Sequence, residues 1–563
     1  MGAEVLASRR IGAPKSRSGC KTCKIRRVKC GEEKPTCYRC SSTGRRCEYG
    51  SDETSPKRPT TPSSLVPSHA LSLSPNPGRR ERRAFEYYFQ HAARYLAGGM
   101  AIDFWTGVVP QLCRTEPAVW DAMIAISGLF EHPDQCADFS LLRAEEKSSH
   151  HLNQAQQDAL AWYSRSISRI HSQIELGKAD PFIALISCVL FICIETIQGR
   201  MEEALILYNQ GVRLILDLRT QVAFGGVSAT NAALLEQKII PLFLRLGTIS
   251  LTISGVQPSE LFAVAEKETG ASRFTSISSA RTAITVLATE VMLFDREARV
   301  HLDTVGCEAF VSQDMLAKKQ CLQAQLDDWL RAYNCLCESI SAESSSSLTF
   351  EPVLLTYHAA ASILLSGCLT SSETVYDAHI ADFVTIIQQA DLVLSASAGP
   401  DGSQPPFTFE MGVGIPLFLT SMKCRETSLR HRALQLLQQA PPMQGFFKCT
   451  PVALLAGNLM RLEEDYASMM CEEGRETLAY DSPPSIAEAL SIQSMPGFIP
   501  EEARLSFCGI FRPANGFPPD IAESDVAGWG RDPDQLFLHY SRKKFDATSG
   551  VWQQVSEIVP LEA

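Results

Sequence analysis

The sequence lacks the long apolar stretches that secreted and membrane proteins need. Its first ten residues, Met1–Arg10, contain no long apolar run and end in two arginines, so we expect no secretory signal peptide. The longest apolar run, Pro181–Ile194, is shorter than the roughly 20 residues that cross a bilayer. We therefore expect no membrane partner, a buried core helix at Pro181–Ile194, and a reducing compartment where clustered cysteines bind metal.

Motifs of several enzyme classes are also missing. The sequence has no metalloprotease His-Glu pair at helical spacing, no phosphate-binding P-loop and no Gly-x-Ser-x-Gly nucleophile turn. One Ser-x-x-Lys string, Ser541–Lys544, is near chance in 563 residues, and we interpret it as a solvated basic patch. The sequence therefore predicts no catalytic residues and no enzymatic activity.

Acidic residues are scarce at the start of the chain. Residues 1–50 hold thirteen Lys and Arg against four Asp and Glu, a net charge of +9. Because the whole chain carries −11, the remaining residues carry −20. A basic N-terminal region in an otherwise acidic chain predicts that residues 1–50 bind a polyanion and that the rest of the chain does not.

Composition divides the chain into five regions. Residues 1–18 form a basic arm that we expect to be disordered, and residues 19–50 contain six cysteines. Residues 51–79 hold six prolines among serines and threonines, which is typical of a linker. Residues 80–475 are predicted to be an all-α region, and residues 476–563 a partly ordered C-terminal region.

The all-α prediction rests on apolar residues that recur at spacings of three and four, which is typical of amphipathic helices. Alternating strand patterns are rare. The cysteines outside the first cluster mostly stand in apolar runs, and we interpret them as buried free thiols. The predicted apolar faces contain Leu160, Tyr163, Ile167, Ile170 and Ile174; Met201, Ala204, Leu205, Tyr208, Val212 and Ile215; and Leu322, Leu326, Trp329, Leu330 and Tyr333.

The six N-terminal cysteines are spaced as two equal halves. In each half, two cysteines are separated by two residues and a third follows after six more. A short helix after each pair can bring the third cysteine back to a metal. Gly44 suits a left-handed end to the second helix, and Gly31 with Pro35 suits the turn between the halves. The cysteines are Cys20, Cys23, Cys30, Cys37, Cys40 and Cys47.

Counting ligands predicts two zinc ions per chain. Zinc prefers four thiolate or imidazole ligands in a tetrahedron. With one zinc, two of the six cysteines would have no metal to bind. Two zincs need eight ligand positions, and six cysteines can fill them only if two thiolates each bind both metals. The repetition suggests that the bridges occupy equivalent places in each half. A piece of 28 residues with almost no apolar core needs metal for its folding energy.

Basic residues crowd this module and favour nucleic-acid binding over a purely structural zinc staple. Basic side chains on a small rigid frame suit phosphate contact and groove reading. Single-stranded RNA readers usually stack bases on aromatic residues, but Tyr38 is the only aromatic residue before Tyr49, which favours duplex DNA. The basic residues are Lys21, Lys24, Arg26, Arg27, Lys29, Arg45 and Arg46.

The cysteine spacing, the internal basic run and a proline two residues before the fourth cysteine resemble the fungal zinc binuclear cluster family of the Zn(2)-Cys(6) type. The resemblance implies that residues 19–50 are a DNA-binding domain in which Cys20 and Cys37 bridge the metals. One zinc would take Cys20, Cys23, Cys30 and Cys37, and the other Cys20, Cys37, Cys40 and Cys47.

The same resemblance implies roles for the basic residues. The end of the first helix would enter the major groove and read a CGG-type triplet, with Arg27 on the guanines because Arg can grip O6 and N7 together. Lys21, Lys24, Arg26, Lys29, Arg45 and Arg46 would contact phosphates or flanking groups.

Three helical segments, Ala84–Leu96, Ala118–Phe130 and Ile186–Asp217, resemble the fungal-specific transcription factor region usually found behind such a cluster. The resemblance implies a nuclear regulator of RNA polymerase II transcription. Its implied targets are the genes of a biosynthetic gene cluster. The alternative is a small-molecule sensor or enzyme in the helical region, with the zinc cluster as a targeting device. Six prolines exclude a coiled coil after the cluster, so the protein is a monomer on DNA or a homodimer through the helical region.

Residues 480–563 mix acidic and aromatic residues, which predicts a mobile segment that recruits coactivators or other transcription machinery. The alternative is that Leu536–Tyr540 and Val551–Val559 pack on the helical region.

Overall fold

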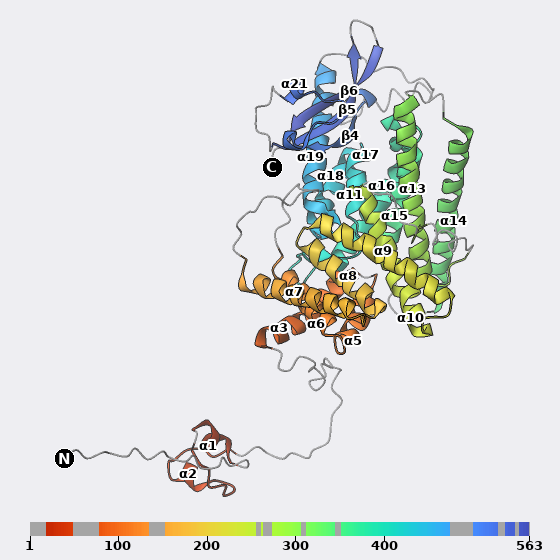
Figure 1. Cartoon of the computed structure of the whole chain (residues 1–563). Coiled ribbons are helices and arrows are strands. Elements are labelled where there is room, and N and C mark those ends of the chain that lie inside the picture. The colour runs from red at the N-terminus through yellow and green to blue at the C-terminus, as the bar shows by residue number, and fades with distance from the viewer. Residues whose placement is uncertain are drawn as a thin grey trace, which may run out of the picture. The chain divides into compact units, whose positions relative to one another are not determined.

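The computed structural model divides the chain into two units, Met1–Ala70 and Leu71–Ala563 (Figure 1). The predicted basic arm and nearly all of the predicted linker lie outside the described residues. The structure describes residues 19–26, 28–48, 78–98, 100–133, 152–254, 261–262, 273–305, 311–343, 351–472, 499–526, 535–546 and 551–561.

The first unit contains two short helices, α1 (Lys21–Ile25) and α2 (Tyr38–Ser41). The second unit is mostly helical, as predicted. Its α-helices are α3 (Arg79–Tyr87), α4 (Ala93–Leu96), α5 (Val109–Leu112), α6 (Pro117–Glu131), α7 (Gln154–Glu175), α8 (Pro181–Ile197), α9 (Met201–Ala223), α10 (Ala229–Leu234), α11 (Ile240–Ser254), α13 (Ile277–Val305), α14 (Gln313–Glu343), α15 (Pro352–Gly367), α16 (Ile380–Ser397), α17 (Gly414–Lys423), α18 (Thr427–Gln439), α19 (Cys449–Glu472) and α21 (Glu523–Val526). Short π-helical turns at Tyr88–Ala92, Phe104–Val108 and Leu235–Ile239 and 3-10 turns at Glu373–His379, Glu501–Ala503 and Pro513–Asn515 connect them.

Most helices of the second unit pack around a large apolar core, and smaller apolar clusters lie beside α19 and the C-terminal strands. Helix α6 packs on α7 and α8, α8 on α9, and α15 on α13 and α16. Helix α8 covers the apolar run at Pro181–Ile194 and is buried from Leu185 to Ile197, which confirms the predicted core helix. Helix α13 is apolar and long enough to cross a membrane at Ile277–Leu302, but 56% of its most apolar stretch is buried inside the protein, as in a core helix.

The predicted apolar faces of α9 and α14 are confirmed, but that of α7 is right only for Tyr163, which is buried, and Ile170, which is partly buried against the core. On α7, Ile167 and Ile174 are 42% and 56% exposed, whereas Ala159 and Ser166 are buried. Small residues decide the orientation, because a side-chain carbon at Gly128 of α6 would lie only 3.1 Å from the Cβ of Ala159. Close approach of the two helices therefore buries these small residues beside Trp162 and Tyr163 and leaves Ile167 and Ile174 at the surface.

Two smaller expectations need correction. The predicted all-α region also contains three two-residue strands, β1 (Phe407–Thr408), β2 (Met443–Gln444) and β3 (Phe447–Lys448), with β1 and β2 parallel and β2 and β3 antiparallel. Of the scattered cysteines, Cys321, Cys335 and Cys508 are exposed rather than buried.

The C-terminal region contains a three-stranded antiparallel sheet in the order β4 (Leu505–Phe511), β5 (Phe537–Asp546) and β6 (Val551–Pro560). Figure 1 shows this sheet at the opposite end of the second unit from α3 and α6. Leu505, Leu538 and Tyr540 pack against α19, and Phe537 is only 1% exposed. Packing on the helices, the alternative interpretation, is therefore correct for Leu538 and Tyr540, with Val559 partly buried against the same cluster. The expectation of exposed aromatic residues is wrong for Phe537 and right for Phe507 and Phe517.

Buried ion pairs join the sheet to the helices. One carboxylate oxygen of Glu463, in α19, accepts hydrogen bonds from Arg425 (2.7 Å) and from the backbone N–H of Leu505 (2.7 Å), at the start of β4. Its other oxygen lies 2.6 Å from Arg430. Burial raises the pKa of Glu463, but the positive charges of Arg425 and Arg430 outweigh this effect and hold the pKa below its usual value.

A second carboxylate extends this cluster. Glu373 pairs with Lys423 at 2.6 Å and lies 3.3 Å from Arg425. Arg504, just before β4, donates to the backbone oxygen of Glu373 and to both carboxylate oxygens of Asp377. Burial raises the pKa of Glu373, but the positive charges of Lys423 and Arg425 outweigh this effect and lower the pKa to about 2. Charged groups from distant parts of the chain therefore hold the sheet in place.

Candidate metal centre and nucleic-acid interface

The six N-terminal cysteines converge in two groups of four thiols. One group is Cys20, Cys23, Cys30 and Cys37, and the other is Cys20, Cys37, Cys40 and Cys47; within each group the sulfur atoms lie within 4.8 Å of one another. The sulfur of Cys20 lies 3.8 Å from that of Cys37 and 3.7 Å from that of Cys40. Four thiolates around zinc, with bonds of about 2.3 Å, lie about 3.8 Å apart. The spacing therefore fits two tetrahedral metals that share two sulfurs.

The backbone repeats the same arrangement around each group. The N–H of Cys20 donates to the sulfur of Cys30 at 3.3 Å, and the N–H of Cys37 donates to that of Cys47, also at 3.3 Å. Cys20 and Cys37 each immediately precede a helix, α1 or α2, which carries the next cysteine of that half. The two cysteines common to both groups, Cys20 and Cys37, therefore occupy equivalent places in the two halves, in keeping with the repeated spacing.

The turns between these elements follow the sequence. Gly44 has φ +63°, the left-handed conformation expected after the second helix. The Lys34–Pro35 peptide in the connection between the halves is cis. Thr22 donates a hydrogen bond to the backbone oxygen of Arg46 (2.8 Å), and Arg26 donates to Thr43 (3.2 Å), so the halves are also tied directly.

Among the described residues of this unit, the cysteines form the interior. Its buried cluster contains Cys20, Cys23, Cys30, Cys37 and Cys40, with Cys47 partly buried beside it. Burial, with hydrogen bonds from neighbouring thiols, raises the pKa of Cys23 to about 12. Burial also raises the pKa of Cys37, but hydrogen bonds from the backbone N–H of Cys40 and from neighbouring thiols lower it to about 6. Bound divalent cations would hold all these sulfurs as thiolates near neutral pH, and their binding would supply the folding energy that an apolar core would give.

The surface around the cysteines is basic. The base-reading candidate, Arg27, lies outside the described residues, and Arg26 is half-buried. Two apolar residues with no predicted role are also at this surface, since Ile25 is 81% exposed and Val28 41% exposed. The exposed members of the predicted phosphate-contacting set are Lys21, Lys24, Lys29, Arg45 and Arg46.

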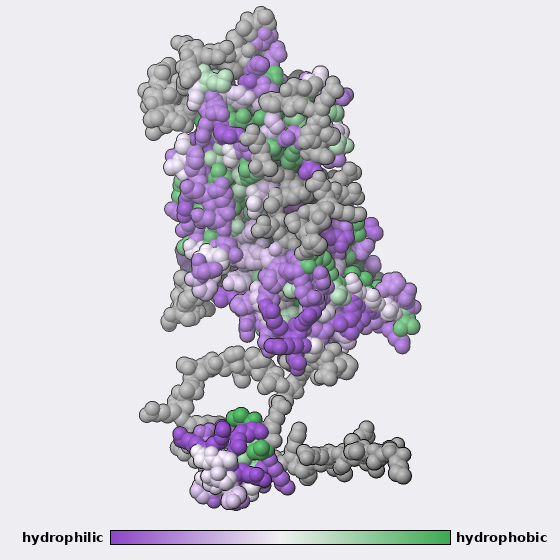
Figure 2. All heavy atoms as spheres, turned by 90° about the vertical axis from the view of Figure 1, so that its left-hand side faces the viewer, coloured by the Kyte–Doolittle hydropathy of each residue, from purple (hydrophilic) through white to green (hydrophobic). Residues whose placement is uncertain are grey.

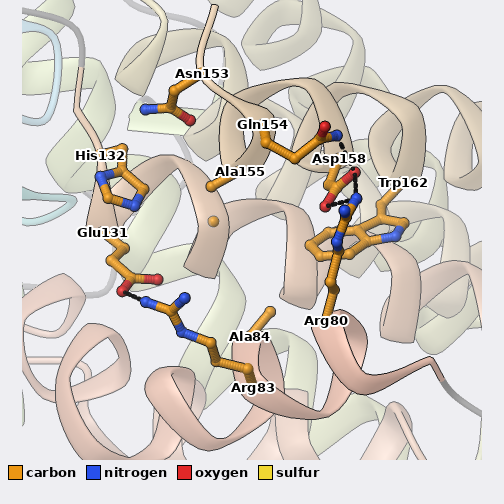
Figure 3. A pocket seen from close by; sticks show the side chains of 11 residues that line it. Arg80, Arg83, Ala84, Glu131, His132, Asn153, Gln154, Ala155, Asp158 and Trp162 are labelled. Carbon is orange, nitrogen blue, oxygen red and sulfur yellow. Dashed lines mark hydrogen bonds and ion pairs between the residues drawn. The ribbon is translucent and has the colours of Figure 1, made fainter.

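The helical unit has a surface pocket of about 350 Å³ between α3, the end of α6 and the start of α7 (Figure 3). Arg80 donates to both oxygens of Asp158 (3.0 and 3.1 Å), and Arg83 pairs with Glu131. No Ser, Thr or Cys is among the described residues that line it, so it offers no hydroxyl or thiol nucleophile. The lining residues are Arg80, Arg83, Ala84, Gly128, Glu131, His132, Asn153, Gln154, Ala155, Asp158 and Trp162.

Comparison with protein families matches residues 18–57 to the fungal Zn(2)-Cys(6) binuclear cluster domain. Residues 18–57 are a zinc binuclear cluster domain of this family. A domain of this kind binds two zinc ions, in agreement with the two groups of thiols. No solved structure matches the chain.

Relatives of this zinc cluster protein are named as transcription regulators. The aspercryptin biosynthesis cluster-specific transcription regulator atnN of Emericella nidulans is 24% identical to this chain. The match covers 71% of this chain and 66% of atnN. The transcription regulator lscL of Purpureocillium lilacinum is 24% identical over 62% of this chain and 87% of its own length. The Zn(2)-C6 fungal-type transcription factor afumD of Aspergillus fumigatus is 31% identical, over 21% of this chain and 34% of that protein.

Proposed function

We propose that the protein is a sequence-specific DNA-binding regulator of RNA polymerase II transcription that reads a CGG-type triplet in the major groove. The observation that carries the proposal is the paired thiol groups sharing Cys20 and Cys37 within a basic surface. Such a module is a compact rigid cation, which suits both phosphate binding and insertion into a groove.

The proposed zinc ligands are the two groups of four cysteines, with Cys20 and Cys37 bridging both ions. Their support is the sulfur spacing and the equivalent hydrogen bonds around each half. Bound there, zinc would have a structural role: the cysteines that hold it would fix α1 and α2 and so position the basic residues.

The proposed DNA contacts divide by role. Arg27 reads the guanines, since a bidentate guanidinium contact matches O6 and N7. Lys21, Lys24, Lys29, Arg45 and Arg46 are exposed and long enough to reach phosphates. Arg26 donates to Thr43, which favours a positioning role combined with a flanking contact.

We assign the protein to the nucleus and its targets to a biosynthetic gene cluster, on the support of a relative named for such a cluster. The helical region would contact transcription machinery or coactivators and, where a homodimer forms, the second copy. The proposal includes no enzymatic activity, because the relatives are named as regulators.

The test is selection of binding sites from random duplex DNA by the zinc-loaded full-length chain. Enrichment of a CGG-type triplet, lost in the Cys37→Ser variant and after zinc chelation, is the expected result. Binding without sequence preference, or enrichment that survives both perturbations, contradicts the proposal. Mapping of bound sites across the genome then identifies the regulated genes.

A further inference from the structure

The two halves of the zinc cluster can be compared position by position. Each cysteine of the first half has its counterpart 17 residues later, as Cys20 has in Cys37 and Cys30 in Cys47. The matching 3.3 Å hydrogen bonds onto Cys30 and Cys47 show that the backbones follow the same course. A residue that one half needs to hold metal should therefore have a similar counterpart in the other.

The exposed apolar residues break this equivalence. Ile25 and Val28 correspond to Ser42 and Arg45, which are polar and exposed. The second half thus builds its metal group without a large apolar side chain at either place. Ile25, at 81% exposed, and Val28, at 41%, are not required by the zinc scaffold.

Ile25 shares one face of α1 with two lysines, and Val28 follows shortly after this helix. Lys21, Lys24 and Ile25 stand at the spacing that places residues on one side of α1. Beyond the end of the helix, the N–H of Val28 bonds to the oxygen of Cys23 (3.2 Å). Cys23 is fully buried on the opposite side. Figure 2 shows hydrophobic atoms at the surface of this module, bordered by hydrophilic ones.

We propose that Ile25, with Val28 beside it, contacts the C5-methyl group of a thymine next to the triplet and so fixes a T·A pair in the binding site. This inference rests on the proposed function. The only apolar group that the major groove presents is that methyl group. Lysines on the same face favour a polyanionic partner over an apolar protein surface, because they would be drawn to phosphates as the apolar side chains enter the groove.

The experiment replaces thymine by uracil, which removes the methyl group and keeps the base pair. The zinc-loaded full-length chain is titrated with its selected duplex and with duplexes in which each thymine beside the triplet is exchanged singly. At one position, binding by the unaltered protein should weaken about fourfold, the affinity equivalent of one buried methyl group.

Variants then assign the contact. Ile25→Ser introduces the residue found at the counterpart position, so the scaffold tolerates it, and it should bind the thymine and uracil duplexes equally. Val28→Ala should reduce the difference, whereas Ser42→Ala should keep it in full. Zinc content at two ions per chain verifies that each variant is folded.

The outcomes separate the two proposals. If the protein selects no sequence, the proposed function fails, and this inference fails with it. If it selects a triplet but uracil has no effect at any position, or Ile25→Ser keeps the full discrimination, the thymine contact is wrong while the proposed function stands. An apolar protein partner for Ile25 would give that second pattern.

Discussion

Replacing Glu463 by Gln tests whether charge holds the C-terminal sheet on the helices. The substitution keeps the size of the side chain and an acceptor for the N–H of Leu505, but removes the negative charge. Arg425 and Arg430 then lose the carboxylate that lies 2.7 and 2.6 Å away. Arg425 keeps Glu373 at 3.3 Å, so Arg430 bears most of the loss.

The expected cost follows from burial. Glu463 and Arg430 are each 1% exposed, so water does not replace the lost charge. Removing one partner of a buried ion pair typically costs about 3–5 kcal/mol. Because a folded domain is stable by only about 5–15 kcal/mol, Glu463→Gln should lose a large share of the free energy of unfolding.

The matched control is Glu297→Gln on the surface. Glu297 pairs with Lys318 at 2.9 Å, but the two side chains are 60% and 52% exposed. Exposed pairs contribute about 0–1 kcal/mol, so this variant should unfold close to the unaltered protein.

Urea unfolding of the full-length chain, followed by helix content, measures both variants. Hydrogen exchange adds a local measurement, since amides of β4, from Leu505 to Phe511, should exchange faster in Glu463→Gln and normally in Glu297→Gln. Equal losses in the two variants, or an unchanged midpoint in Glu463→Gln, would refute the argument that charge holds the sheet.

Three further predictions concern the metal, the DNA contact and pH. Cys37→Ser removes a sulfur common to both thiol groups and should retain less zinc than Cys47→Ser, which leaves one group of four intact; equal zinc contents by metal analysis would contradict the bridging role. Arg27→Ala should cost about 1–3 kcal/mol of discrimination between matched and scrambled duplexes, whereas Lys29→Ala should weaken both alike and lower the salt slope by roughly one; equal effects would exclude Arg27 as a base reader. Because the pKa of Glu373 is lowered to about 2, its contribution to stability is complete above about pH 4.5 and is lost as pH falls towards 2, so Glu373→Gln should flatten the acid dependence of the urea midpoint.

The sequence by itself determined the zinc cluster. Metal ligands within a stretch of 28 residues are brought together by local turns, so their spacing is enough to predict two groups with shared sulfurs. The left-handed turn at Gly44 was equally predictable, since glycine adopts a positive φ without steric cost. The apolar faces of α9 and α14 also followed from spacing alone, because each buries a broad stripe of large side chains.

Only the tertiary structure decided the orientation of α7 and the place of the C-terminal sheet. Small residues let α7 approach α6 so closely that Ala159 and Ser166 are buried while Ile167 and Ile174 stay at the surface. The sheet is held by pairs far apart in the chain, such as Arg504 with Asp377, 127 residues away. No local pattern reports such partners, because a charge is stabilised by whichever opposite charge the fold brings to it.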